Sequence, residues 1–369
     1  MGMTLEEFKD IYWWEWFHRM LGRGIGLAFA LPGAALALSG SIPRSLRGRL
    51  GLAFALGGTQ GLIGWWMVKS GLDHKNYEGE NKYRDPRVSP YRLATHLTMA
   101  FSIFSILLWT GLDALAMAKE GSIARAAAAA KGDAIAAAKV AAAAPTAAAT
   151  RAAARMLPVL TLATGFVGLT SFAGAFVAGN DAGRAYNDWP LYAGRHIPEE
   201  IWDEKLGARN VFENTATVQF DHRNLAYGTV AAVGATTALW IGGGAVRHLP
   251  RTANVALAHL GLGVLGQAGI GIVTLMSYVP VELGAAHQGG ALALLGAALW
   301  SRHAVGRVAA SRVSRAAAKG ATGVGETTGA HVTAKAGGAV AASATGFAIS
   351  SGVESMGSVR DSSGPLPRN

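Results

Sequence analysis

Residues 252–281, TANVALAHLGLGVLGQAGIGIVTLMSYVPV, decide the fold because these 30 residues contain no Asp, Glu, Lys or Arg. A helix of about 20 apolar residues is enough to cross the hydrocarbon core of a membrane. Six further runs of at least 19 residues also lack these charges, and they are 24–43, 50–68, 93–112, 156–180, 224–246 and 283–301. Seven such runs in one chain predict an all-α integral membrane protein with seven spanning helices, rather than a soluble protein with buried helices.

The charges lie outside these runs, and their signs predict an orientation. The net charge is +10 and only 15% of the residues are charged. No basic stripe alternates with aromatic residues, so nucleic-acid binding is disfavoured. The segments after the first, third, fifth and seventh runs are basic with few acids, which places them inside, in the matrix or cytoplasm, and the N-terminus outside. The chain has no cysteine, which excludes disulfides and thiolate metal sites.

The chain contains an internal repeat that is visible in four landmarks. A His-Arg-x-Leu motif begins a span in each half, the next span has Gln-x-x-Ile-Gly, and the third has Ala-x-His followed thirteen residues later by tryptophan. These landmarks are EWFHRML at 15–21 and QFDHRNL at 219–225, QGLIG at 60–64 and QAGIG at 267–271, ATH at 94–96 and AAH at 285–287, and Trp109 and Trp300. Their common order predicts two related halves.

The repeat also predicts how the chain is divided. The run at 156–180 precedes the second trio of spans and has no partner before the first trio. We therefore expect a helical bundle of two pseudo-repeated four-helix halves, with the first helix of the N-terminal half missing from this sequence. The expected segments are the N-terminal half 1–117, an exposed alanine-rich basic insertion 118–155, the C-terminal half 156–306 and a disordered tail 307–369.

Four histidines occupy the same level of this bundle. Alternate spans run in the same direction, so His18, His96, His222 and His287 all lie at or near an outer helix start. Each half thus supplies two imidazoles from different helices, a common way to hold haem iron on both axial faces. Zinc would require three or four ligands at one centre. Proton relay in a transporter is the remaining alternative for histidines in membrane spans.

The two halves differ beside these histidines. Glu15 lies three residues before His18, whereas Gln219 holds the equivalent place before His222. An ionisable carboxyl in one half alone indicates that this half performs proton-coupled chemistry while the other carries electrons. The alternative is that Glu15 only complements the positive end of its helix.

Two arginines follow the histidines at equivalent positions, Arg19 in the first half and Arg223 in the second. Either could bind haem propionates, because arginine binds carboxylates through two parallel hydrogen bonds. Snorkelling of the side chain to the membrane interface is the alternative.

These motifs resemble the haem A synthases, specifically their mitochondrial and proteobacterial branch. The strings that carry the resemblance are 15–23, 60–72 and 86–97 in the first half, and 174–183, 218–223 and 286–288 in the second. The resemblance covers about residues 4–303 apart from the alanine-rich insertion. Members of this family normally have eight spans.

The resemblance implies an activity and a role for each half. The family oxidises a methyl group of haem O to the formyl group of haem A by successive hydroxylations with oxygen from water, for cytochrome c oxidase assembly. By resemblance, His18 and His96 bind the substrate haem and Glu15 is essential to its chemistry. His222 and His287 would hold a haem b cofactor that passes electrons.

The resemblance also implies surroundings and partners. We expect a multi-pass protein of the mitochondrial inner membrane, with the bacterial plasma membrane as the alternative. Haem O would come from haem O synthase, and electrons would pass to a partner such as a ferredoxin; membrane lipid is a further partner, and a homo-oligomer is left open. Two competing functions are a bis-histidine cytochrome b that only transfers electrons, and a transporter or assembly factor without enzymatic activity.

Overall fold

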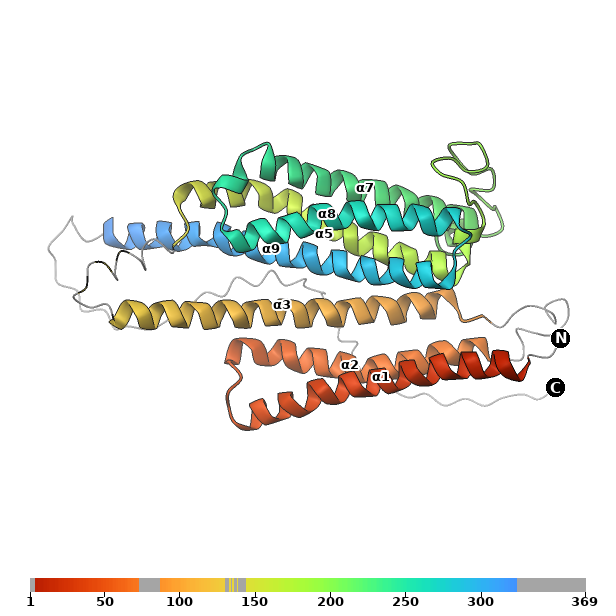
Figure 1. Ribbon diagram of the computed structural model, residues 1–369, viewed down its shortest axis with the longest axis horizontal. Helices are drawn as coiled ribbons and strands as arrows, with labels where there is room; N and C mark the ends of the chain where they lie inside the picture. Colours follow the sequence, from red (N-terminus) through yellow and green to blue (C-terminus); the bar gives the residue numbers. More distant parts are fainter. Residues whose placement is uncertain are drawn as a thin grey trace, which may run out of the picture. The chain divides into compact units, whose positions relative to one another are not determined.

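The computed structural model describes residues 4–72, 87–129, 133, 135, 138 and 144–323. In this part the chain forms helices, with no strand beyond one isolated bridge between Tyr192 and Arg195. The long helices are α1 (Leu5–Leu38), α2 (Arg44–Gly71), α3 (Pro90–Ala129), α5 (Ala147–Gly179), α7 (Thr215–Ile241), α8 (Arg251–Met276) and α9 (Val281–Gly323), with a short α6 (Asn210–Glu213) before α7 (Figure 1). The predicted all-α class is confirmed.

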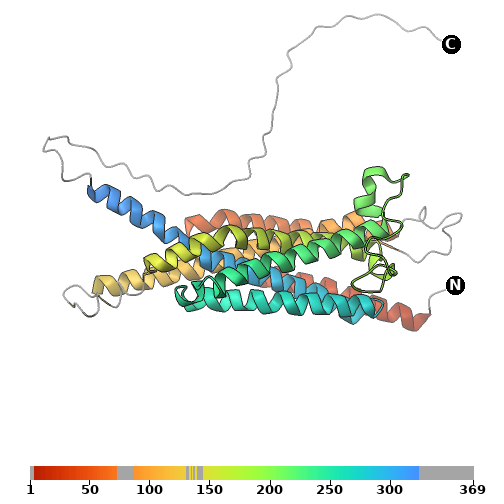
Figure 2. The ribbon, with the colours of Figure 1, turned by 90° about the horizontal axis from the view of Figure 1, so that it is seen from above.

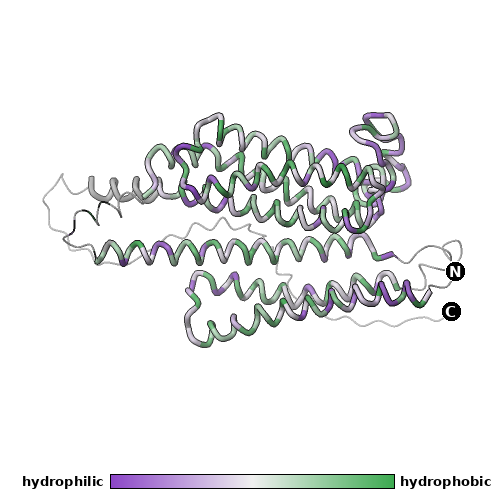
Figure 3. The backbone as a smooth tube through the Cα atoms, viewed as in Figure 1, coloured by the Kyte–Doolittle hydropathy of each residue, from purple (hydrophilic) through white to green (hydrophobic). Residues whose placement is uncertain are grey.

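Each of the seven charge-free runs falls on one of the seven long helices in the described part of the chain. Four of them, α1, α3, α5 and α8, are long and apolar enough to count as membrane spans by length and composition. Helices α2, α7 and α9 are also at least 27 residues long but are not among these four candidates. Hydrophilic residues gather in the segment between α5 and α7, at one end of the bundle (Figure 3).

The C-terminal half has the larger buried core. Side chains from α5, α7, α8 and α9 meet in one cluster that includes Leu160, Val233, Leu260 and Ala298. Many of the other members are alanines, whose small side chains let helices approach closely inside a membrane. Helix α3 packs against α5 and so joins the N-terminal half to this core (Figures 1 and 2).

The N-terminal half is more open. Helix α2 packs along α3, whereas α1 has no buried residue. The outer end of α1 exposes a group of aromatic side chains, which are Phe8, Tyr12, Trp13, Trp14, Trp16 and Phe17. Tryptophan and tyrosine are enriched where a helix meets the headgroup region of a membrane, so this group agrees with an outer boundary near the start of α1.

The structure describes parts of the alanine-rich insertion and of the C-terminal tail. The insertion 118–155 is not exposed throughout, because Ala149 and Ala153 at the start of α5 are buried. The tail does not lose its structure at residue 307, since α9 continues to Gly323 and Val308 is buried. Alanine favours helix and also packs closely, so an alanine-rich sequence is no sign of exposure. The rest of these two segments, residues 130–132, 134, 136–137, 139–143 and 324–369, lies outside the described residues.

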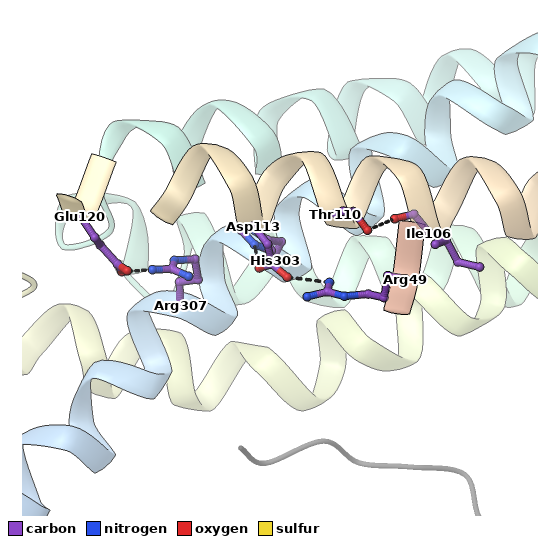
Figure 4. A network of polar contacts seen from close by, with 7 residues as sticks. All are labelled: Arg49, Ile106, Thr110, Asp113, Glu120, His303 and Arg307. Carbon is purple, nitrogen blue, oxygen red and sulfur yellow. Dashed lines mark hydrogen bonds and ion pairs between the residues drawn. The ribbon is translucent and has the colours of Figure 1, made fainter. Parts of the chain in front are cut away.

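A polar cluster joins the two halves just beyond the inner ends of three charge-free runs (Figure 4). Asp113 on α3 accepts hydrogen bonds from Arg49 of α2 at 2.7 Å and from His303 of α9 at 2.9 Å. The His303 side chain is only 7% exposed, and its ring packs edge-on against Trp109. Because Asp113 binds a residue from each half, we call the three residues Arg49, Asp113 and His303 the inner clamp.

We expect Asp113→Ala to destabilise the protein by roughly 2 kcal/mol or more, because it leaves two partly buried hydrogen-bond donors without their acceptor. Glu120→Ala is the matched control on the same helix. Glu120 pairs with Arg307 of α9, but this pair is more exposed and should contribute less than about 1 kcal/mol. Thermal unfolding in detergent micelles measures both, and equal losses would contradict the role of the clamp.

Candidate functional site

The structure brings the predicted histidine pair of the C-terminal half together. His222 on α7 and His287 on α9 have ring centroids 6.5 Å apart, with ring planes at 87°. A metal bonded to one nitrogen of each ring at about 2 Å would separate the centroids by roughly 6 Å. The two rings therefore lie at the spacing that a shared axial iron requires.

Hydrogen bonds hold both histidines in place. His222 Nδ1 lies 3.1 Å from the main-chain oxygen of Thr170 on α5. An N–H at this Nδ1 that donates to Thr170 would orient the ring and leave His222 Nε2 to bind iron, as in other ligating histidines. Gln267 Nε2 on α8 donates to the main-chain oxygen of His287 at 2.8 Å and so holds this residue through its backbone.

A glycine on the neighbouring helix faces each of three histidine rings. A Cβ atom would lie 3.0 Å from His96 Cε1 at Gly64, 3.1 Å from His222 Cε1 at Gly174, and 2.8 Å from His287 Cε1 at Gly271. Any larger residue would push the ring out of place. Gly64 and Gly271 belong to the repeated Gln-x-x-Ile-Gly motif. From the sequence alone, this motif is only a landmark of the repeat and predicts no function.

The N-terminal half repeats this arrangement in part. Gln60 on α2 donates to the main-chain oxygen of His96 at 3.0 Å, and its Nε2 lies 3.4 Å from His96 Nε2. The Nδ1 atom of His96 is buried without a partner in the described residues. His18 lies on α1, the helix without a buried residue, and no hydrogen bond or ring contact joins it to His96 among the described residues. Ligation by His18 and His96 therefore stays a prediction.

Glu15 and Gln219 have different surroundings. Glu15 forms an ion pair with Arg19 one turn further along α1, and both side chains are about half exposed. Gln219 is only 2% exposed and donates to the main-chain oxygens of Ala182 at 2.8 Å and Tyr186 at 3.0 Å. Gln219 therefore anchors the segment between α5 and α7, residues 180–214, which we call the outer loop. The Glu15 carboxylate, in contrast, stays accessible to a ligand and to water.

Arg223 is also an anchor of the outer loop. Its guanidinium donates to the main-chain oxygens of residues 188, 190 and 191 and stacks 3.9 Å from the ring centroid of Tyr192. Its Nε is buried without a partner in the described part of the chain. Binding of propionates by Arg223 and Arg19 stays a prediction, and no pattern in the sequence indicated this loop contact.

Two carboxylates, those of Asp188 and Glu200, accept hydrogen bonds within the outer loop itself. The main-chain N–H groups of Ala193 and Gly194 bind the Asp188 carboxylate and lower its pKa. A lowered folded-state pKa means that Asp188 stabilises the loop above its usual pKa, and that this stabilisation is lost as the pH falls through the lowered value. The hydrogen bond to Glu200 raises the pKa of Tyr186 to about 12, so Tyr186 stays a donor at neutral pH.

We expect Gln219→Leu to release the outer loop, because it removes two hydrogen bonds of a buried amide at a cost of about 1 kcal/mol each. Main-chain amides near residues 182–186 should then exchange with solvent at least about tenfold faster. Asn224→Leu is the control, since Asn224 is exposed on the same helix and bonds only to Phe220 of its own turn. Unchanged exchange in Gln219→Leu would refute the anchoring role.

Comparison with known proteins identifies the relatives of this chain. The family described as cytochrome oxidase assembly protein (COX15-CtaA) matches residues 1–299. The chain is 46% identical over 309 residues to Heme A synthase COX15 of Arabidopsis thaliana, covering 83% of this chain and 60% of that protein. It is 41% identical to Heme A synthase of Rhodospirillum centenum, covering 82% of this chain and 70% of that protein. For Heme A synthase COX15 of Bos taurus the identity is 40%, over 83% of this chain and 66% of the relative. Together with the paired histidines, these matches show that the chain belongs to the COX15-CtaA family of cytochrome oxidase assembly proteins.

Proposed function

We propose that this chain is a haem A synthase, an oxidoreductase of the mitochondrial inner membrane or of a bacterial plasma membrane. The observation that carries the proposal is the asymmetry between two histidine pairs on one repeated frame. Only the N-terminal pair has an accessible carboxylate, Glu15, one turn away; the equivalent Gln219 is buried in loop contacts. The names of the relatives support the same activity.

The proposed reaction converts the methyl group of haem O to the formyl group of haem A. One methyl group and one water molecule give the formyl group, four protons and four electrons. The first hydroxylation removes two electrons and forms an alcohol. The second removes two more and forms a hydrated aldehyde, which loses water. A protein that does this must accept protons near the methyl group and lead electrons away from it.

The N-terminal half has the residues that would accept protons near the methyl group. His18 and His96 would hold the substrate haem through its iron, and Gln60 and Gly64 orient His96. Glu15, on the same helix face as His18, would accept protons as the methyl group is oxidised, and the Arg19 ion pair orients its carboxylate. A positioned carboxylate is a usual general base in such a step.

The C-terminal half has the residues that would lead electrons away. The spacing of His222 and His287 fits a haem b, which when bound provides one-electron transfer. Thr170, Gly174, Gln267 and Gly271 hold the two rings. We propose that electrons leave this site to a soluble carrier such as a ferredoxin, and that haem O synthase delivers the substrate.

A bis-histidine cytochrome b is the second candidate, and the spacing of the His222 and His287 rings supports it as well. The haem extracted from purified protein distinguishes the two functions. Haem A or hydroxylated haem O beside haem b supports the synthase, whereas haem b alone in both halves supports the cytochrome.

We expect Glu15→Gln to reduce conversion of haem O at least about a hundredfold, because the amide cannot accept a proton. Bound haem b should be unchanged, since Glu15 belongs to the other half. Extraction of the pigments and their separation by chromatography measure both quantities. Arg23→Gln, two turns further along the same exposed helix, is the control, and full conversion by Glu15→Gln would show that this carboxylate takes no part.

We expect Gly271→Ala to lower the haem b content or to change its low-spin electron paramagnetic resonance signal, because the new methyl group meets the His287 ring at 2.8 Å. Gly269→Ala is the matched control on the same helix, where a Cβ has nothing within 4 Å. Spectra that are identical in the two variants would contradict ligation by His287.

A further inference from the structure

A cavity of about 620 Å³ lies between the two halves. Its walls come from α2, α3 and α5, and include Leu56, Ala94, Thr98, Met99, Phe172 and Phe176. The volume is in the range of small-ligand sites. Neither histidine pair lines this cavity, so it is separate from the iron-binding positions described above.

The walls of the cavity suit a hydrocarbon. The side chains are mainly aliphatic and aromatic, and the hydroxyl groups of Thr95 and Ser102 are already donated to main-chain oxygens one turn earlier on α3, each at 2.8 Å. Phe172, Phe176 and Phe212 contact one another edge-on or tilted and close one side. An occupant gains affinity here by burying methylene groups.

The cavity begins next to the proposed substrate site. Leu56 lies four residues before Gln60 on α2, and Met99 lies three residues after His96 on α3. Residues three or four apart are neighbours on one helix face. Both side chains therefore sit one turn inward from the contact between Gln60 and His96, and the cavity continues from that point towards α5.

The C-terminal half is closed at two of the equivalent positions. The repeat aligns Leu56 with Gly263 and Met99 with Gly290. A Cβ at Gly263 would lie 3.3 Å from Leu294 Cδ1, and a Cβ at Gly290 would overlap Oε1 of Gln267. Gly289, the equivalent of Thr98, has nothing within 4 Å of an added Cβ. The two halves thus differ next to the Gln-His contact, where α8 and α9 pack directly and α2 and α3 do not.

We infer that this cavity binds the isoprenoid side chain of the substrate haem. Haem O carries such a long chain on its ring, whereas haem b has a vinyl group at that position. A cavity beside His96 but not beside His287 thus matches a haem with the chain in the N-terminal half and a haem without it in the C-terminal half. The inference rests on the proposed function and gives the N-terminal half its preference for haem O.

Thr98→Phe tests the inference, because Thr98 is exposed on α3 and its replacement would fill the cavity without entering the core. The purified protein, with haem b already bound, is titrated with haem O and separately with more haem b. We expect the affinity for haem O to fall at least about tenfold, the weak binding of additional haem b to be unchanged, and the haem b spectrum of the C-terminal half to match the wild type. Ala235→Phe is the control, since it adds the same ring at an exposed position of α7 outside the cavity.

Two results would overturn the inference. Thr98→Phe could bind haem O as tightly as the wild type, or it could lose haem O and additional haem b to the same extent. Failure of the proposed function is seen separately, because wild-type protein would then neither bind nor convert haem O. The retained haem b of the C-terminal half shows in every case that the variant is folded.

Discussion

The contact between a histidine ring and a glycine on the next helix is the constraint on which both sites depend. An imidazole at membrane level needs its nitrogens satisfied and its ring held in one orientation. At Gly64, Gly174 and Gly271 the helix backbone approaches so closely that an added Cβ would lie only about 3 Å from the ring. Polar groups one turn away on the same helices, Gln60, Thr170 and Gln267, then reach the histidines. The spacing of α2 from α3, of α5 from α7, and of α8 from α9 follows from these contacts.

The same frame carries two different chemistries because a few positions around it differ. Where one half has the accessible Glu15, the other has Gln219, whose amide nitrogen donates to two main-chain oxygens of the outer loop. Where one half has Met99 beside an open cavity, the other has Gly290 packed against Gln267. Each change is local and leaves the ring contacts intact, so a duplicated haem-binding unit can acquire a substrate site in one half while the other remains closed.

The sequence was sufficient for features that repeat or are periodic, and insufficient for long-range contacts. The helices and the His222–His287 pair were predicted because apolar runs and paired motifs are local signals. The pairing of Asp113 with His303 spans 190 residues, and no periodicity indicates which acid meets which base. The sequence motif around Arg223 is the same whether the arginine binds a propionate or loop carbonyls. The helix propensity of Ala149 is likewise the same whether the residue is exposed or buried. Only tertiary packing decides between these alternatives.

The inner clamp and the cavity are connected through the helices that they share. Arg49 and Asp113 belong to α2 and α3, and the same two helices supply Leu56, Thr98 and Met99 to the cavity nearer the histidines. His303 fixes α3 to α9, while α3 also packs on α5, which closes the cavity with Phe172. The clamp and the cavity therefore lie along one interface between the halves, the clamp towards the inner side and the cavity nearer the histidines.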